Sequence, residues 1–145
     1  MMKKKLQEDY RVLQKQSAWL KISYDECNKI GIKENYTVDE FGRFETFCSR
    51  YSRSIDYLVR KMFRTIDSYE FENQGTLIDT VNNAHKRGLI DSVETLRTMK
   101  DVRNTLVHEY IEDNLQETFD EVLEYSVLLM SIMKTTEKYV ENLKL

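Results

Sequence analysis

Apolar residues recur at intervals of three, four or seven positions along most of this 145-residue chain. That spacing follows the 3.6-residue turn of an α-helix and gives each segment one apolar face for burial. It predicts five helices, over residues 3–30, 37–71, 75–88, about 91–110, and from 113 onward. No segment shows the two-residue alternation of a half-buried strand. The sequence therefore predicts one all-α domain spanning residues 1–145, an up-and-down bundle of about five helices.

The second predicted helix carries the longest apolar stripe, which consists of Phe44, Phe47, Tyr51, Ile55, Leu58, Met62 and Ile66. Its spacing is close to 3.5 residues, the period at which two helices pack nearly parallel or antiparallel to each other. We therefore expect this helix to lie almost antiparallel to the first.

Signals for helix ends separate the periodic segments. Gly31 and Gly88 suit the left-handed position that follows a helix. The segment from Thr37 to Glu40 has the pattern of a capping box, in which two side chains satisfy free backbone N–H groups. Similar patterns at Asp91 to Glu94 and at Asp113 to Gln116 predict the starts of the last two helices.

Composition favours long helices in a cytoplasmic protein. The chain has no proline and only 4 glycines, the residues that most often interrupt helices. No apolar run reaches the roughly 20 residues needed to cross a membrane. The lysines near the N-terminus precede no apolar segment, so no secretory signal is expected.

Charge and cysteine content narrow the function further. A net charge of −3 argues against a protein that coats nucleic acid broadly, although a local basic patch can still bind RNA. Cys27 and Cys48 lack metal-ligand spacing and are predicted to be buried, reduced thiols. We expect no metal site.

Candidate chemistry is concentrated in one segment, which contains Arg103, Asn104, His108 and Tyr110. A guanidinium can bind a scissile phosphate and stabilise the charge of the transition state. An imidazole can take the proton of a ribose 2′-hydroxyl or deliver one to the leaving oxygen. Asn104 can orient the histidine or bind the phosphate. By themselves, one arginine and one histidine are more often a surface ion and a core histidine than a catalytic pair.

The complete segment resembles the R-x4-H-x-Y signature of the HEPN superfamily, in the HepT branch, where a polar residue follows the arginine. The flanking segments 75–79 and 86–90 and the helix layout are also similar to that family. The resemblance implies a homodimeric, metal-independent ribonuclease toxin whose paired motifs line a cleft at the dimer interface. Arg103, His108 and Asn104 would then form the catalytic site.

The resemblance also implies a regulatory partner. HepT-like toxins are encoded beside MntA, a small nucleotidyltransferase antitoxin that uses ATP to attach AMP to the motif tyrosine. In this chain the modified residue would be Tyr110. The toxin itself would need no cofactor, because ATP serves only as the AMP donor.

A second, weaker candidate for RNA contact is the basic series on the second predicted helix, formed by Arg50, Arg53, Arg60, Lys61 and Arg64. Asp56 is the only acidic residue between Arg50 and Arg64. The series is predicted to lie on the exposed side, where it could guide an RNA backbone or an acidic antitoxin. A solvated helix face is the simpler interpretation.

Two other functions remain open at this stage. The chain could be a non-catalytic HEPN subunit that binds substrate for a nucleotidyltransferase, or a helical scaffold protein. The presence of Arg103, His108 and Tyr110 together favours the ribonuclease, because a binding subunit does not need all three.

Overall fold

The computed structural model describes residues 2–70, 75–109 and 115–145, including all of their side chains except those of 107–109. All the regular elements in these residues are helical, which confirms the predicted all-α class. They are α1 (Met2–Ile30), α2 (Val38–Tyr57), the π-helical turn η1 (Leu58–Met62), α3 (Phe63–Tyr69), α4 (Leu77–Lys86), α5 (Val93–Glu109) and α6 (Leu115–Asn142). Because α2, η1 and α3 follow one another without a break, the described chain forms five helical rods.

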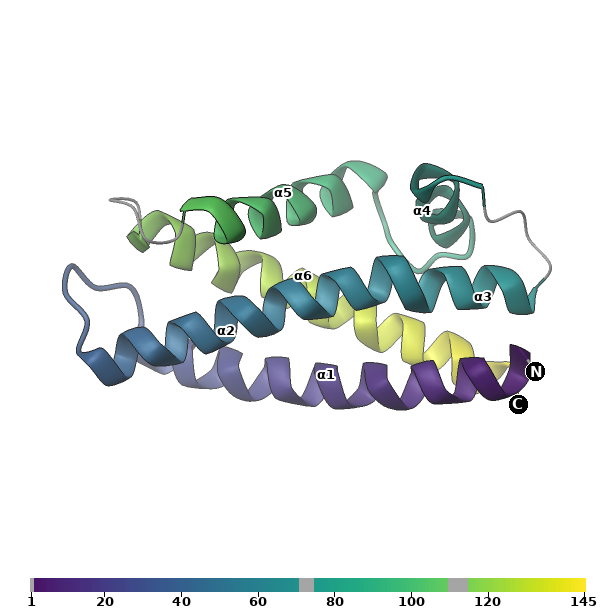
Figure 1. Cartoon of the computed structure of the whole chain (residues 1–145), viewed down its shortest axis with the longest axis horizontal. Coiled ribbons are helices and arrows are strands. Elements are labelled where there is room, and N and C mark those ends of the chain that lie inside the picture. Colours follow the sequence, from purple (N-terminus) through teal and green to yellow (C-terminus); the bar gives the residue numbers. More distant parts are fainter. Residues whose placement is uncertain (1, 71–74, 110–114) are drawn as a thin grey trace.

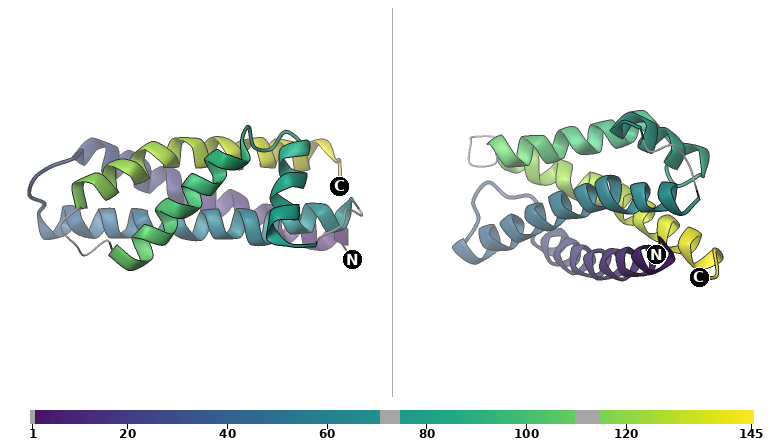
Figure 2. Two further views of the ribbon diagram at one scale, coloured as in Figure 1. Left: turned by 90° about the horizontal axis from the view of Figure 1, so that it is seen from above. Right: turned by 45° about the vertical axis from the view of Figure 1, so that its right-hand side comes forward.

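The long helices alternate in direction, as the up-and-down prediction required. Figure 1 shows α1 running one way and α2, η1 and α3 returning beside it, with α5 and α6 repeating the alternation. The short α4 lies across the end of the bundle at which both termini are found (Figure 2). Helix α5 packs against α2 and α6, while α1 packs against α2, α3 and α6. This arrangement places the 101–106 segment of α5 over α2.

The predicted apolar stripes form the core. Every residue of the stripe on α2, η1 and α3 is at most 1% exposed. The rings of Phe44 and Phe119 stack at 4.3 Å, and Tyr36 contacts both rings edge-on. The hydroxyl of Tyr51 donates a hydrogen bond to the carbonyl of Met99 at 2.8 Å, which ties α2 directly to α5. The buried hydroxyl group therefore has the hydrogen-bond partner that a buried polar group needs.

A π turn interrupts the second helix, where the sequence predicted unbroken α-helix. The N–H of Phe63 bonds to the carbonyl of Leu58, five residues back. The buried carboxylate of Asp9 on α1 accepts hydrogen bonds from residues on both sides of the turn, Tyr57 at 2.9 Å and Thr65 at 2.6 Å. The extra residue of the π turn lets the helix keep its apolar face inward before and after it.

Most of the predicted helix ends are confirmed. Thr37 and Glu40 form the reciprocal capping box, and Gly31 and Gly88 have positive φ values of 74° and 78°. The prediction for α5 was wrong by one residue, because the Ser92 hydroxyl, not Asp91, accepts the N–H of Thr95 at 3.3 Å. Asp113, predicted to cap the last helix, lies outside the described residues.

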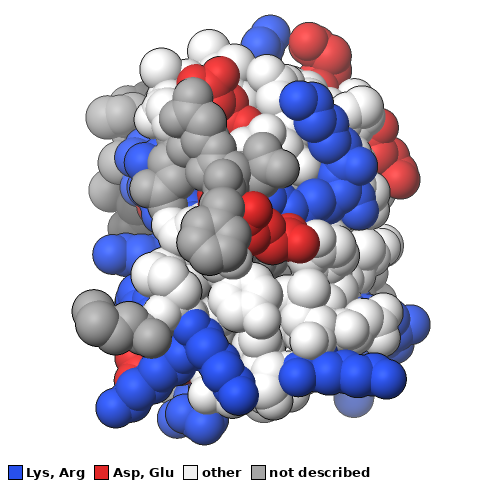
Figure 3. All heavy atoms as spheres, turned by 90° about the vertical axis from the view of Figure 1, so that its right-hand side faces the viewer, with Lys and Arg blue, Asp and Glu red and all other residues white. Residues whose placement is uncertain are grey.

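Charged side chains alternate on the end of the molecule that carries the termini. Figure 3 shows Lys and Arg in several separate groups, with acidic and uncharged surface between them. None of the described helices is long and apolar enough to span a bilayer.

Candidate functional site

Arg103 lies on the side of α5 that faces α2, where it forms an ion pair with Asp56. One Asp56 oxygen accepts hydrogen bonds from Nη2 at 2.9 Å and from Nε at 3.2 Å. The side chains of both residues remain about one-third exposed, at 30% and 33%. The pair is therefore anchored in the protein and also open to solvent.

Among the described residues, the ion pair leaves part of the guanidinium available for a ligand. Asp56 occupies the edge formed by Nε and Nη2, and the Oδ1 atom of Asn104 lies 3.4 Å from Nη1. A guanidinium carries more N–H groups than these two acceptors use, and each terminal nitrogen keeps an N–H for another partner. Two such N–H groups can bind a phosphate through two of its oxygens.

An open groove of about 430 Å³ adjoins this pair between α2 and α5. Six of its eight lining residues are polar or charged, and the full lining consists of Glu45, Cys48, Ser49, Ser52, Arg53, Asp56, Arg103 and Leu106. Burial, together with the proximity of Cys27 and Glu45, raises the pKa of the Cys48 thiol to about 12. That thiol is protonated at neutral pH, so it is no nucleophile for substrate in the groove.

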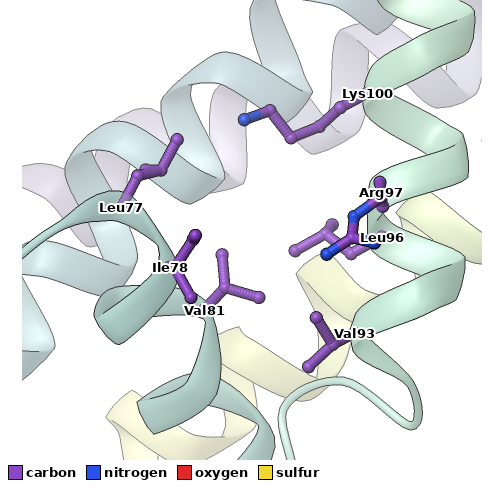
Figure 4. A pocket seen from close by; sticks show the side chains of 7 residues that line it. All are labelled: Leu77, Ile78, Val81, Val93, Leu96, Arg97 and Lys100. Carbon is purple, nitrogen blue, oxygen red and sulfur yellow. The ribbon is translucent and has the colours of Figure 1, made fainter.

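Lys100 adds a further cation one helical turn before Arg103. Its side chain is half-buried. Burial lowers the pKa of Lys100, and the nearby charges of Arg60 and Arg103 act in the same direction, partly opposed by Asp56 and Asp101. Lys100 also borders an apolar hollow of about 110 Å³ between α4 and α5, across whose rim it extends from α5 (Figure 4).

The structure tests the predicted catalytic residues only in part. Arg103 borders the groove, and the exposed Asn104 contacts the Arg103 guanidinium but does not line the groove. The backbone of His108 belongs to α5, but its side chain is not described. Tyr110 lies outside the described residues. The convergence of these four residues stays a prediction.

The basic series on the second helix does not form one exposed face, contrary to prediction. Arg50 is half-buried, with hydrogen bonds to the Trp19 carbonyl and to the Ser23 hydroxyl, and its guanidinium lies 5.8 Å from the Trp19 ring centre. Arg64 is half-buried too, and donates to Thr80 at 3.5 Å. These two side chains hold helices together.

Three members of that series remain exposed: Arg53, Arg60 and Lys61. Of these, Arg53 borders the groove beside Arg103. Arg60 is near Lys100, and its positive charge lowers the pKa of Lys100.

The sequence analysis missed two features of the site. It did not identify Asp56 as the partner of Arg103, and it assigned no role to Lys100. Signals for both are present in retrospect. Asp56 is the one acidic residue within the basic series, and Lys100 precedes Arg103 by three positions, which places both on one helix face. The sequence did not show that α5 packs on α2, and this packing brings Asp56 to Arg103.

No metal centre is evident in the described residues, which contain no group of three or more His, Cys, Asp or Glu side chains suited to hold an ion.

Comparisons with protein-family models, with curated proteins and with solved structures gave no match.

Proposed function

We propose that this protein is a metal-independent endoribonuclease toxin of the HEPN type, with Arg103 and His108 as its catalytic pair. The observation that carries the proposal is the state of Arg103. One edge of its guanidinium is held by Asp56 at an open groove, and the other described residues leave N–H groups for a phosphate. The same helix carries a histidine five residues later.

Arg103 would bind the scissile phosphodiester and stabilise the negative charge that builds on its oxygens during cleavage. His108 would take the proton from the ribose 2′-hydroxyl. The 2′-oxygen then forms a bond to phosphorus while the bond to the 5′-oxygen breaks, and that oxygen leaves with a proton from a general acid. The products are a 2′,3′-cyclic phosphate and a 5′-hydroxyl.

This reaction uses one proton acceptor and one proton donor, and each chain has a single motif histidine. A homodimer related by a two-fold axis would bring two motifs together and supply both groups. The toxin would be silenced by a nucleotidyltransferase antitoxin that adds AMP to Tyr110. The added phosphate would repel the RNA backbone by like charge.

The direct test is RNA cleavage by the purified chain in the presence of EDTA. Arg103→Ala and His108→Ala should each lower the rate by about a hundredfold to ten-thousandfold while circular dichroism stays unchanged. Arg97→Ala is the matched control, since Arg97 is an exposed arginine on the same helix that pairs with Glu94 at 3.5 Å. If both motif variants cleave as fast as the parent, the ribonuclease proposal is wrong. An inactive parent that binds a nucleotidyltransferase would support the non-catalytic subunit instead.

A further inference from the structure

We infer that Lys100 and Arg60 form a second phosphate-binding position, which takes the phosphodiester next to the scissile one on a single-stranded RNA. The inference rests on the proposed function, and it assigns a substrate contact to Lys100. Arg103 and Lys100 would then hold two successive phosphates of one strand.

Two helices bring these cations together. Lys100 and Arg103 are three residues apart on α5, so their side chains leave the helix on the same face, about 5 to 6 Å apart at Cβ. Arg60, in η1, follows Asp56 along the rod against which α5 packs. Both Arg60 and Arg103 are close enough to Lys100 to disfavour its charged form.

Charge at this place is unbalanced. Three cations, Lys100, Arg60 and Arg103, stand against two carboxylates, Asp56 and Asp101. Asp56 is paired with Arg103 at 2.9 Å, and in the part of the chain that the structure describes Lys100 forms no ion pair. A half-buried ammonium beside two guanidinium groups costs free energy, because burial and like charge both disfavour it. A bound anion would remove that cost. The excess of positive charge is local, since the whole chain carries a net charge of −3.

A phosphodiester strand fits these cations better than a single carboxylate does. The planar guanidinium of Arg103 suits bidentate binding of the phosphate that reacts. The ammonium of Lys100 is a point charge on a flexible stem, which suits a phosphate that needs to be held but not cleaved. Arg103 borders the open groove, whereas Lys100 and Arg60 lie outside its lining, and Arg60 is exposed. A strand bound in the groove would therefore continue past Arg103 to reach them.

The test is binding of a fluorescent single-stranded RNA to His108→Ala protein, measured by anisotropy over a series of salt concentrations. Adding Lys100→Gln should weaken binding roughly tenfold, and should reduce the slope of log K against log salt by about 0.7, the value for one phosphate contact on a single strand. Lys100→Arg keeps the charge and should retain most of the affinity. Lys138→Gln, an exposed lysine on α6, is the matched control and should change neither quantity.

Equal affinity and slope for Lys100→Gln and the His108→Ala parent would overturn the inference. Displacement of the RNA by ATP at the same phosphate concentration would also overturn it, because the site would then be one for a mononucleotide. Failure of the proposed function would give a result different from failure of this inference. If the unsubstituted chain cleaves RNA while Lys100→Gln in the His108→Ala background binds normally, the ribonuclease proposal stands and this site is wrong. If the unsubstituted chain never cleaves RNA, yet Lys100→Gln weakens binding, the phosphate site stands and the ribonuclease proposal is wrong.

Discussion

The Asp56 carboxylate holds the Arg103 guanidinium by one edge, with a single oxygen 2.9 Å from Nη2 and 3.2 Å from Nε. Asp56 is thus a positioning residue if Arg103 binds the scissile phosphate. Removing it leaves a long, flexible side chain free to rotate away from the groove.

We expect Asp56→Ala to lower kcat by roughly tenfold to a hundredfold, the usual effect of misplacing a catalytic group. Asp56→Asn keeps an acceptor for the guanidinium and should lose less. Steady-state cleavage of a defined RNA separates kcat from KM, while thermal unfolding reports any loss of stability. A faster Asp56→Ala enzyme would instead mean that Asp56 competes with the substrate phosphate.

The protein should be a homodimer in solution. The proposed reaction needs two proton-transfer groups, and each chain offers one motif histidine. The chain also leaves large apolar side chains exposed on its long helices, including Trp19 at 52% and Ile22 at 53% on α1. Sedimentation at about 10 micromolar should give twice the 17.4 kDa of one chain. His108→Ala should remain a dimer, and a stable monomer of the parent would contradict the proposed active site.

Tyr110 should be the acceptor of AMP from the antitoxin. A phenol close to a guanidinium loses its proton more readily and becomes a better nucleophile toward the α-phosphorus of ATP. We expect mass spectrometry of the co-expressed pair to find AMP on Tyr110, and Tyr110→Phe to resist neutralisation. Tyr125→Phe, on α6, serves as the control and should be silenced normally. Full neutralisation of the toxin while Tyr110 stays unmodified would show that binding alone silences it.

Stability should depend on Asp9, which is 2% exposed and accepts hydrogen bonds from Lys5, Tyr57 and Thr65. Burial by itself would raise the pKa of Asp9, but these hydrogen bonds outweigh it and lower the pKa below the ordinary value of 3.8. Asp9→Asn should therefore cost about 2 kcal/mol at neutral pH, since charge-assisted hydrogen bonds are lost.

A lowered folded-state pKa stabilises the protein above the unfolded-state value, and the contribution disappears as pH falls through the folded-state pKa. The difference between parent and Asp9→Asn should thus narrow below about pH 4, as measured by urea unfolding. Asp25→Asn is the control: Asp25 is 52% exposed in an ion pair with Lys21, and its loss should cost under about 1 kcal/mol. A constant difference at all pH values would contradict the role assigned to the Asp9 charge.

Local pattern was sufficient for much of the fold. The apolar stripe from Phe44 to Ile66 is buried as predicted, and the capping box at Thr37 begins α2. Such features depend on neighbours within about one helical turn, so the sequence alone specifies them. The motif around Arg103 was also visible in the sequence, because its residues lie on one short segment.

Contacts between distant segments were decided only by tertiary packing. Asp56 and Arg103 are 47 positions apart, and nothing local to either residue indicates the other. Arg50 was predicted to be exposed with its neighbours, yet it turns toward Trp19 and Ser23, because α1 lies beside it in the bundle. The π turn at Leu58 likewise lies between two residues that bind Asp9 on another helix. Periodicity determines which face of a helix is buried, but packing determines which charged group meets which partner.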